Sequence, residues 1–242
     1  MEKIPNSRIR RIRTWMPGKS PSELTEVEKD NQQVSLIDLA SNDYLGLARH
    51  PSLIEAAKRA LATEGVGSGG SRFITGTRAI HRKLEQELAE WLNRDIVLVY
   101  PSGFQANLAA VIALADRHTP IIADRLIHHS LITGVRASGG KLMRFAHNNL
   151  SELEALLKKS KQQQPLKRPL VITESLFSME GTSAPIKEIS TLCAKYDSKL
   201  LIDEAHAFGI MGSKGRGETF GIKEPISIIS GTFGKAFGGG GA

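Results

Sequence analysis

Short apolar runs alternate with helix-like patterns over most of this sequence. Between the runs, apolar residues recur every three or four positions, as in the stripe of Phe104, Leu108, Val111, Ile112 and Ala115. Strands that alternate with helices of ordinary length predict βαβ crossovers and a mostly parallel sheet with helices on both faces. The predicted fold class is therefore α/β. The predicted strands cover residues 96–100, 120–124, 141–145, 170–173, 199–203 and 226–230.

The first 45 residues differ in character from the rest. They are basic and polar, with an arginine cluster from Arg8 to Arg13. We predict an N-terminal arm over residues 1–45, with a short strand at 36–40, and one large α/β domain over 46–242. Pro51 predicts the first position of a helix, where its missing N–H costs nothing. Ser151 and Glu154 have the spacing of a capping box and predict another helix start.

Composition narrows the class of function. Lys and Arg number 32 against 25 Asp and Glu, but the excess is spread along the chain and aromatic residues make up only 5%. We therefore expect anionic small molecules, such as phosphates and coenzyme A, rather than nucleic acid. The single cysteine, Cys193, favours a reducing compartment. With no signal peptide and no apolar run of membrane-spanning length, a cytoplasmic protein without a membrane partner is expected.

Two chemically useful side chains follow predicted strands. Asp203 ends the run 199–203, and Lys235 lies among glycines just after the run 226–230. A lone lysine between glycines is more typical of a flexible surface loop. Shielded from water, however, a lysine loses its proton and forms a Schiff base, and ligands in parallel sheets bind beyond the carboxyl ends of strands. A carboxylate for a pyridinium nitrogen and an amine for an aldehyde together predict a pyridoxal-phosphate site.

Other strand ends carry further candidates. Gly103 and Phe104 open a helix directly after a strand, which suits a phosphate but equally an ordinary turn. His128 and His129 follow the strand 120–124; without a recognisable metal motif, a structural histidine is the default. The alternative interpretation, that one of these imidazoles stacks on a flat heterocycle, is favoured only when Lys235 and Asp203 are considered with it.

The glycine-rich stretch 65–70 matches G-x-G-x-x-G formally. A helical pattern precedes it, whereas a dinucleotide site requires a strand there. No Walker pattern is present, so nucleotide hydrolysis is disfavoured. A nucleotide-binding doubly wound domain remains the alternative from the residues alone, and it predicts no carbonyl cofactor.

In chain order, several motifs resemble the α-oxoamine synthases, which are fold-type-I pyridoxal-phosphate enzymes. The resemblance implies an aspartate-aminotransferase-like fold and covers nearly the whole chain. The motifs are Ser41–Leu47, Gly67–Arg72, Thr75–Thr77, Ser102–Phe104, Ala123–Leu126 with His128, Glu174–Met179, Asp203–His206 and Thr232–Lys235.

The resemblance also implies roles for individual residues. Lys235 corresponds to the Schiff-base lysine that moves the substrate proton, and Asp203 to the partner of the pyridinium nitrogen. His128 is implied to be catalytic together with Lys235 and Asp203. The cofactor-binding residues are implied to hold the ring (His128), its phenolic oxygen (Ser178 and His206) and the phosphate (Gly103 and Phe104), with Thr232 near the lysine loop. The substrate is implied to bind Arg13, Asn42 and His128.

Within the family, the sequence most resembles the members that condense L-alanine with pimeloyl-coenzyme A or a pimeloyl-acyl carrier protein. The products are 8-amino-7-oxononanoate, the free carrier and carbon dioxide, in biotin biosynthesis. Members that use glycine or serine are the alternative, and a non-catalytic subunit is disfavoured by Lys235 and Asp203. The family forms homodimers and continues beyond the lysine loop into a C-terminal domain. We therefore expect a homodimer. We also expect this chain to be C-terminally truncated, and the polypeptide alone to be poorly folded and inactive.

Overall fold

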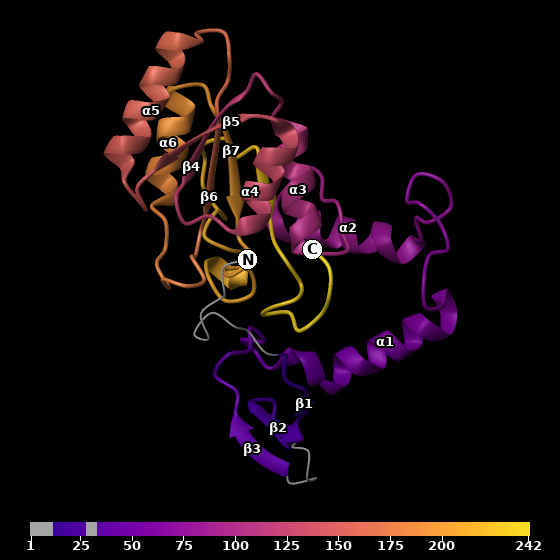
Figure 1. Ribbon diagram of the computed structural model, residues 1–242. Helices are drawn as coiled ribbons and strands as arrows, with labels where there is room; N and C mark the ends of the chain where they lie inside the picture. The colour runs from indigo at the N-terminus through magenta and orange to yellow at the C-terminus, as the bar shows by residue number, and fades with distance from the viewer. Residues whose placement is uncertain (1–11, 28–32) are drawn as a thin grey trace, which may run out of the picture.

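The computed structural model describes residues 12–27 and 33–242. Its centre is a five-stranded parallel sheet with the strand order β5-β4-β6-β7-β8 (Figure 1), which confirms the predicted α/β class. All neighbouring pairs are parallel, as crossover helices require. The strands are β4 (Pro120–Asp124), β5 (Lys141–Phe145), β6 (Leu170–Glu174), β7 (Lys199–Asp203) and β8 (Ile228–Ser230).

Helices cover both faces of this sheet, because successive side chains of each strand point to opposite sides. On one side Ile121 and Ile172 join a buried cluster with α3 (Gly103–Leu114) and α4 (His129–Ser138). On the other side Ile122 and Val171 pack against α5 (Leu150–Gln163) and α6 (Ile186–Lys195). Figure 1 shows the two helical layers on either side of the strands. The central strands therefore read as continuous apolar runs in the sequence.

The N-terminal part contains a separate antiparallel sheet of β1 (Trp15–Pro17), β2 (Glu23–Val27) and β3 (Gln33–Ile37), in that order. The strand predicted at 36–40 thus lies at 33–37. Its early end has a local cause: the Asp38 carboxylate accepts the N–H groups of Ala40 and Ser41, both at 3.0 Å, which turns the chain. Residues 1–11, with most of the arginine cluster, lie outside the described residues.

Two helices connect this sheet to the main body: α1 (Pro51–Glu64) and α2 (Ala79–Leu92). Short 3-10 turns lie at Leu47–Arg49 and Ser213–Gly215. α1 begins at Pro51, as predicted. The glycine-rich stretch 65–70 follows α1 rather than a strand, so the structural context of a dinucleotide site is missing.

The start of α5 differs slightly from the prediction. Its N-cap is Asn149, whose side chain accepts the N–H of Glu152 at 3.0 Å, so the helix begins at Leu150. Glu152 in turn accepts the N–H of Ala146 at 2.7 Å. The predicted capping box at Ser151 and Glu154 is therefore wrong, because an asparagine two positions earlier already satisfies the free N–H groups.

A second prediction is also wrong: residues 96–100 do not form a strand. The segment is extended but pairs only at its end, where the N–H and carbonyl groups of Tyr100 and Ala242 exchange hydrogen bonds of 2.7 and 2.9 Å. No described strand runs beside residues 96–99, so a strand cannot form there whatever the local preference. Ile96 and Leu98 consequently remain 77% and 59% exposed.

Candidate active site

The predicted functional residues gather at the carboxyl edge of the parallel sheet. Glu174 at the end of β6 lies opposite Asp203 at the end of β7, and Asp203 lies opposite Ser230 at the end of β8. The loop that follows β8 carries Lys235. This arrangement follows from parallel strands, since all their carboxyl ends meet at one edge.

Lys235 contacts His206 in the loop after β7. Its Nζ atom lies within hydrogen-bonding distance of Nε2 of the ring. Burial lowers the pKa of Lys235, while the negative charge of Asp203, and that of Glu174 when it is ionised, oppose this effect. Burial, followed by the positive charge of Lys235, lowers the pKa of His206 to about 4. The imidazole is therefore neutral at physiological pH, and the lysine loses its proton more readily than a surface lysine.

Asp203 is a buried carboxylate that no cation pairs with in the described part of the chain. Its Oδ2 atom accepts a hydrogen bond from the side-chain amide of Asn107 at 2.7 Å, and Oδ1 accepts the N–H of Ala205 at 2.9 Å. The Asn107 amide also donates to the Ser130 hydroxyl at 2.9 Å. Two helices and one strand thus fix the carboxylate, and a buried carboxylate that has hydrogen bonds but no ion-pair partner is suited to a cationic ligand.

The first turn of α3 lies beside the lysine loop. Ser102 caps the helix by accepting the N–H of Gln105 at 3.3 Å. The N–H groups of Gly103 and Phe104 have no acceptor among the described residues. A Cβ built on Gly103 would lie 3.6 Å from Cβ of Thr232, whose hydroxyl donates to the Gly241 carbonyl at 3.0 Å. Free N–H groups at the positive end of a helix form an anion site.

Glu174 is a second buried carboxyl group at this edge. It accepts the backbone N–H of His128, which caps α4. Burial raises the pKa of Glu174 to about 8, with a further upward contribution from Asp203 and opposing ones from the His128 N–H and Lys235. Glu174 therefore holds a proton at neutral pH, and the edge carries less negative charge than its sequence suggests.

The structure brings some predicted residues together and leaves others apart. Lys235, His206, Asp203, Gly103 and Thr232 lie on adjoining strand ends and loops. The ring of His128 is exposed, with Nδ1 at 2.7 Å from the hydroxyl of Ser130, which also binds Asn107. Asn42 contacts these residues only indirectly: its Oδ1 accepts a hydrogen bond from the Tyr44 hydroxyl, which also contacts His206. Ser178 is exposed and makes no side-chain hydrogen bond within the described residues. Arg13 pairs with Glu26 at 3.8 Å in the N-terminal sheet.

Three side chains of the site were not predicted from the sequence: Tyr44, Asn107 and Glu174. Asn107 carries the clearest signal, because it is a polar residue one turn from Phe104 and Val111 on a buried helix face. Glu174 belongs to one of the family motifs but had no predicted role. The contact of Tyr44 with His206 spans 162 residues of sequence and leaves no local signal.

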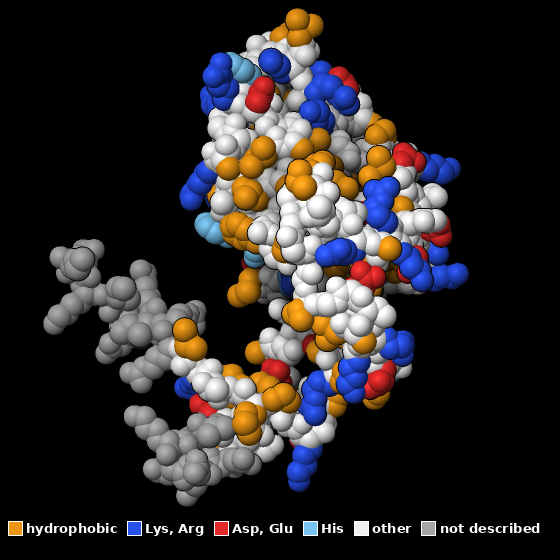
Figure 2. Space-filling model, turned by 90° about the vertical axis from the view of Figure 1, so that its right-hand side faces the viewer, with side chains coloured by type: hydrophobic (Ala, Val, Ile, Leu, Met, Phe, Trp, Pro, Cys, Tyr) orange, Lys and Arg blue, Asp and Glu red, His pale blue; other side chains and the backbone are white. Residues whose placement is uncertain are grey.

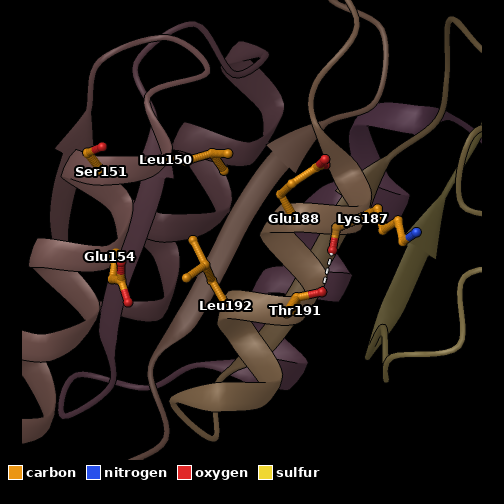
Figure 3. Close-up of a pocket in the computed structure, with 7 residues that line it drawn as sticks. All are labelled: Leu150, Ser151, Glu154, Lys187, Glu188, Thr191 and Leu192. Carbon is orange, nitrogen blue, oxygen red and sulfur yellow. Dashed lines mark hydrogen bonds between the residues drawn. The ribbon is translucent and has the colours of Figure 1, made fainter.

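A groove of about 390 Å³ lies on the outer layer, between α5 and α6. Figure 3 shows Leu150 and Leu192 facing it from the two helices, while the Thr191 hydroxyl donates to the Lys187 carbonyl at 2.9 Å. It contains none of the predicted site residues. Within the described ranges, no group of three His, Cys, Asp or Glu side chains is placed to hold a metal ion.

Comparison with known proteins agrees with this geometry. Residues 34–242 match the family model for aminotransferase class I and II, so the chain belongs to that family. It is 44% identical over 214 residues to 8-amino-7-oxononanoate synthase of Photobacterium profundum, covering 88% of this chain and 54% of that protein. The enzyme of the same name from Enterobacter sp. (strain 638) is 39% identical over 232 residues, which covers 96% and 58%.

Two solved structures extend the comparison. Serine palmitoyltransferase from S. paucimobilis, with a bound PLP–myriocin aldimine, superimposes with a TM-score of 0.86 at 31% identity, covering 94% of this chain and 56% of that one. 8-Amino-7-oxononanoate synthase from Francisella tularensis gives a TM-score of 0.72 at 32% identity, with 85% and 57% covered. The fold is therefore that of the fold-type-I pyridoxal-phosphate transferases. The chain spans about half the length of the relatives it matches.

The residues present fit pyridoxal phosphate. The unpaired Asp203 carboxylate suits a protonated pyridine nitrogen, and the free N–H groups of Gly103 and Phe104 suit a phosphate. Lys235, half-buried between them, suits an aldehyde. The three partners that the cofactor requires thus lie at one edge of one sheet.

Proposed function

We propose that this chain carries the pyridoxal-phosphate site of an α-oxoamine synthase that joins L-alanine to a pimeloyl thioester. The observation that carries the proposal is the pairing of a buried, cation-free Asp203 with a half-buried Lys235 of lowered pKa at neighbouring strand ends. The similarity to 8-amino-7-oxononanoate synthases supports the alanine and pimeloyl substrates.

Each residue then has a defined task. Asp203 would accept the N–H of the pyridinium ring, Gly103 and Phe104 would donate to the phosphate, and Thr232 would support the lysine loop. His128 would bind the ring, while His206 and Ser178 would bind its phenolic oxygen. Bound pyridoxal phosphate supplies an electron sink that stabilises negative charge at the α-carbon of the amino acid.

Lys235 takes the α-proton of alanine and later returns one. An amine acts as a base only when it is neutral, and the lowered pKa of Lys235 favours that form near physiological pH. Asn42 and Arg13 are the proposed ligands of the alanine carboxylate. For Arg13 this role requires the N-terminal segment to leave its pairing with Glu26.

The proposal is tested by turnover with alanine, glycine and serine, each with pimeloyl-coenzyme A. Release of coenzyme A and carbon dioxide is expected to be fastest with alanine, by at least about 10-fold, because one methyl group or hydroxyl in a fitted pocket is worth about 1–3 kcal/mol. Lys235→Ala is the control for background hydrolysis. Faster turnover with serine would instead favour the activity named for the serine palmitoyltransferase neighbour.

We also propose that two copies of this chain associate. None of the residues of α1 is buried, and large apolar side chains are exposed from position 53 to position 112. Figure 2, which views the molecule from the side of α1 and α2, shows hydrophobic side chains at several places on this surface. Apolar side chains exposed in this number along one segment are typical of an interaction surface. Light scattering is expected to give twice the chain mass of 26.3 kDa, and a monomer at micromolar concentration would contradict the proposal. The exposed large apolar residues between positions 53 and 112 are Leu53, Ile54, Leu61, Val66, Phe73, Ile74, Ile80, Ile96, Leu98, Phe104 and Ile112.

No helix in the described residues is both long enough and apolar enough to span a bilayer.

A further inference from the structure

His147 and Asn148 follow β5 at the carboxyl edge of the sheet, and β4 lies between β5 and β6. The Asp124 carboxylate at the end of β4 accepts the backbone N–H of Asn148 at 2.8 Å. Both of its oxygens lie 3.1 Å from Nδ1 of His147. Asp124 is fully buried, and a carboxylate only accepts hydrogen bonds, so a ring proton of His147 lies on Nδ1. The imidazole is therefore fixed from the side of β4.

The same imidazole contacts the turn after β6 that carries Ser178. Nε2 of His147 lies 2.8 Å from the hydroxyl of Thr182, and the ring meets the ring of Phe177 edge-on, with 4.4 Å between the centroids. The Phe177 N–H donates to the Thr182 carbonyl at 3.0 Å, and the Gly181 N–H donates to the Phe177 carbonyl at 2.8 Å. Phe177 and Thr182 thus close the turn, and both of these residues contact one ring.

The contact between His147 and Thr182 does not depend on the charge of the ring. A neutral ring with its proton on Nδ1 accepts the Thr182 hydroxyl proton at Nε2, and a protonated ring donates from Nε2 to the hydroxyl oxygen. Within the described residues, the Thr182 hydroxyl has no other hydrogen-bond partner. Ser178 is exposed and makes no side-chain hydrogen bond there. The position of the Ser178 hydroxyl therefore depends on the backbone of the turn, which His147 holds.

We propose that His147 is a positioning residue that fixes the turn 177–182 against the ends of β4 and β5 and so places Ser178 for the cofactor. The step from the turn to the phenolic oxygen rests on the proposed function. The base of the turn has a separate anchor, because the side-chain amide of Asn148 donates to the Ser183 carbonyl at 3.1 Å. Loss of the contact between His147 and Thr182 is therefore expected to loosen the turn without unfolding the sheet below it.

The first test measures amide hydrogen exchange of the cofactor-free chain. Thr182→Val removes the hydroxyl and nearly preserves the shape of an exposed side chain. The N–H groups of Phe177 and Gly181 are expected to exchange about 5-fold faster in this variant, which is the effect of one lost hydrogen bond. The N–H of Ile172, buried in the centre of β6, should exchange as in wild type, because it reports opening of the sheet and not of the turn.

Further variants separate the contact from general destabilisation. Thr182→Ser restores a hydroxyl and should return the exchange rates to those of wild type. His147→Ala should accelerate the same two N–H groups at least as much as Thr182→Val does. In the His147→Ala chain, Thr182→Val should add nothing, because the hydroxyl acts only through the ring. Thr191→Val is the matched control, since it removes a hydroxyl that donates to Lys187 within α6, and it should behave as wild type.

The second test measures how the visible absorbance of the chain loaded with pyridoxal phosphate depends on pH. A hydroxyl that donates to the phenolic oxygen withdraws negative charge from it, so the neighbouring imine nitrogen binds its proton less tightly. Ser178→Ala is therefore expected to raise the pH of the absorbance change by about 1 unit, the effect of one hydrogen bond to a charged group. Thr182→Val should shift it in the same direction by less, and Thr182→Ser should match wild type.

Four results would overturn the proposal. Thr182→Val leaves the exchange of Phe177 and Gly181 unchanged, or it accelerates Ile172 equally, or it still acts in the His147→Ala chain. The fourth is an absorbance change that moves in Ser178→Ala but not in Thr182→Val. The expected exchange rates in a chain that binds no pyridoxal phosphate, or whose absorbance ignores Ser178→Ala, would support the positioning of the turn and defeat only the proposed function of Ser178.

Discussion

Replacing Lys235 by alanine is expected to abolish covalent capture of pyridoxal phosphate by this chain. The wild-type chain, mixed with the cofactor and reduced with borohydride, should carry the label on Lys235. The reason is that burial lowers the pKa of this amine, so its neutral form is more available near pH 7 than that of an ordinary surface lysine. Peptide mapping by mass spectrometry locates the label.

Lys187→Ala is the matched control, since Lys187 is exposed at the start of α6 and has no part in the site. It should label as wild type does. If the Lys235→Ala chain is labelled to the same extent and the label is spread over other lysines, then the cofactor reacts non-specifically with exposed lysines. In that case the assignment of Lys235 would be wrong.

The second large effect is expected on the pH dependence of the free energy of unfolding, to which Glu174 contributes. Unfolding returns the carboxyl group from a pKa of about 8 to its ordinary value of 4.5. The folded chain therefore holds a proton that the unfolded chain releases, and stability falls as pH rises from about 4.5 to about 8. Glu174→Gln, which cannot ionise, should remove this dependence. Below pH 4.5 the two proteins should be equally stable, and above pH 8 the variant should be more stable by about 5 kcal/mol.

Urea denaturation of the cofactor-free chain between pH 4 and pH 9 measures the difference directly. The amide keeps an oxygen to accept the His128 N–H, so the backbone contact is retained. Glu180→Gln, in the exposed turn after the same strand, is the control and should leave the profile unchanged. A Glu174→Gln profile parallel to wild type would mean that Glu174 is ionised in the folded protein.

Segments whose partners lie within the chain folded as their patterns predict. The apolar runs at 120–124, 141–145 and 199–203 became strands over the same residues, because each pairs with a parallel neighbour in the sheet. Helices bury the runs at 120–124 and 199–203 on both faces. The run at 96–100 is at least as apolar, but it has no described partner along most of its length and forms no strand. Strand preference thus expresses itself only where a neighbour supplies the hydrogen bonds.

The sequence by itself determined the α/β class, the order of its elements and the presence of Lys235 and Asp203 after neighbouring strands. These features depend on periodicity and on residues close together in the chain. Only the tertiary structure decided that Asn107 holds Asp203, that Glu174 keeps a proton and that Tyr44 contacts His206. Such contacts join segments up to 162 residues apart, and they depend on burial and on facing geometry, which no local pattern records.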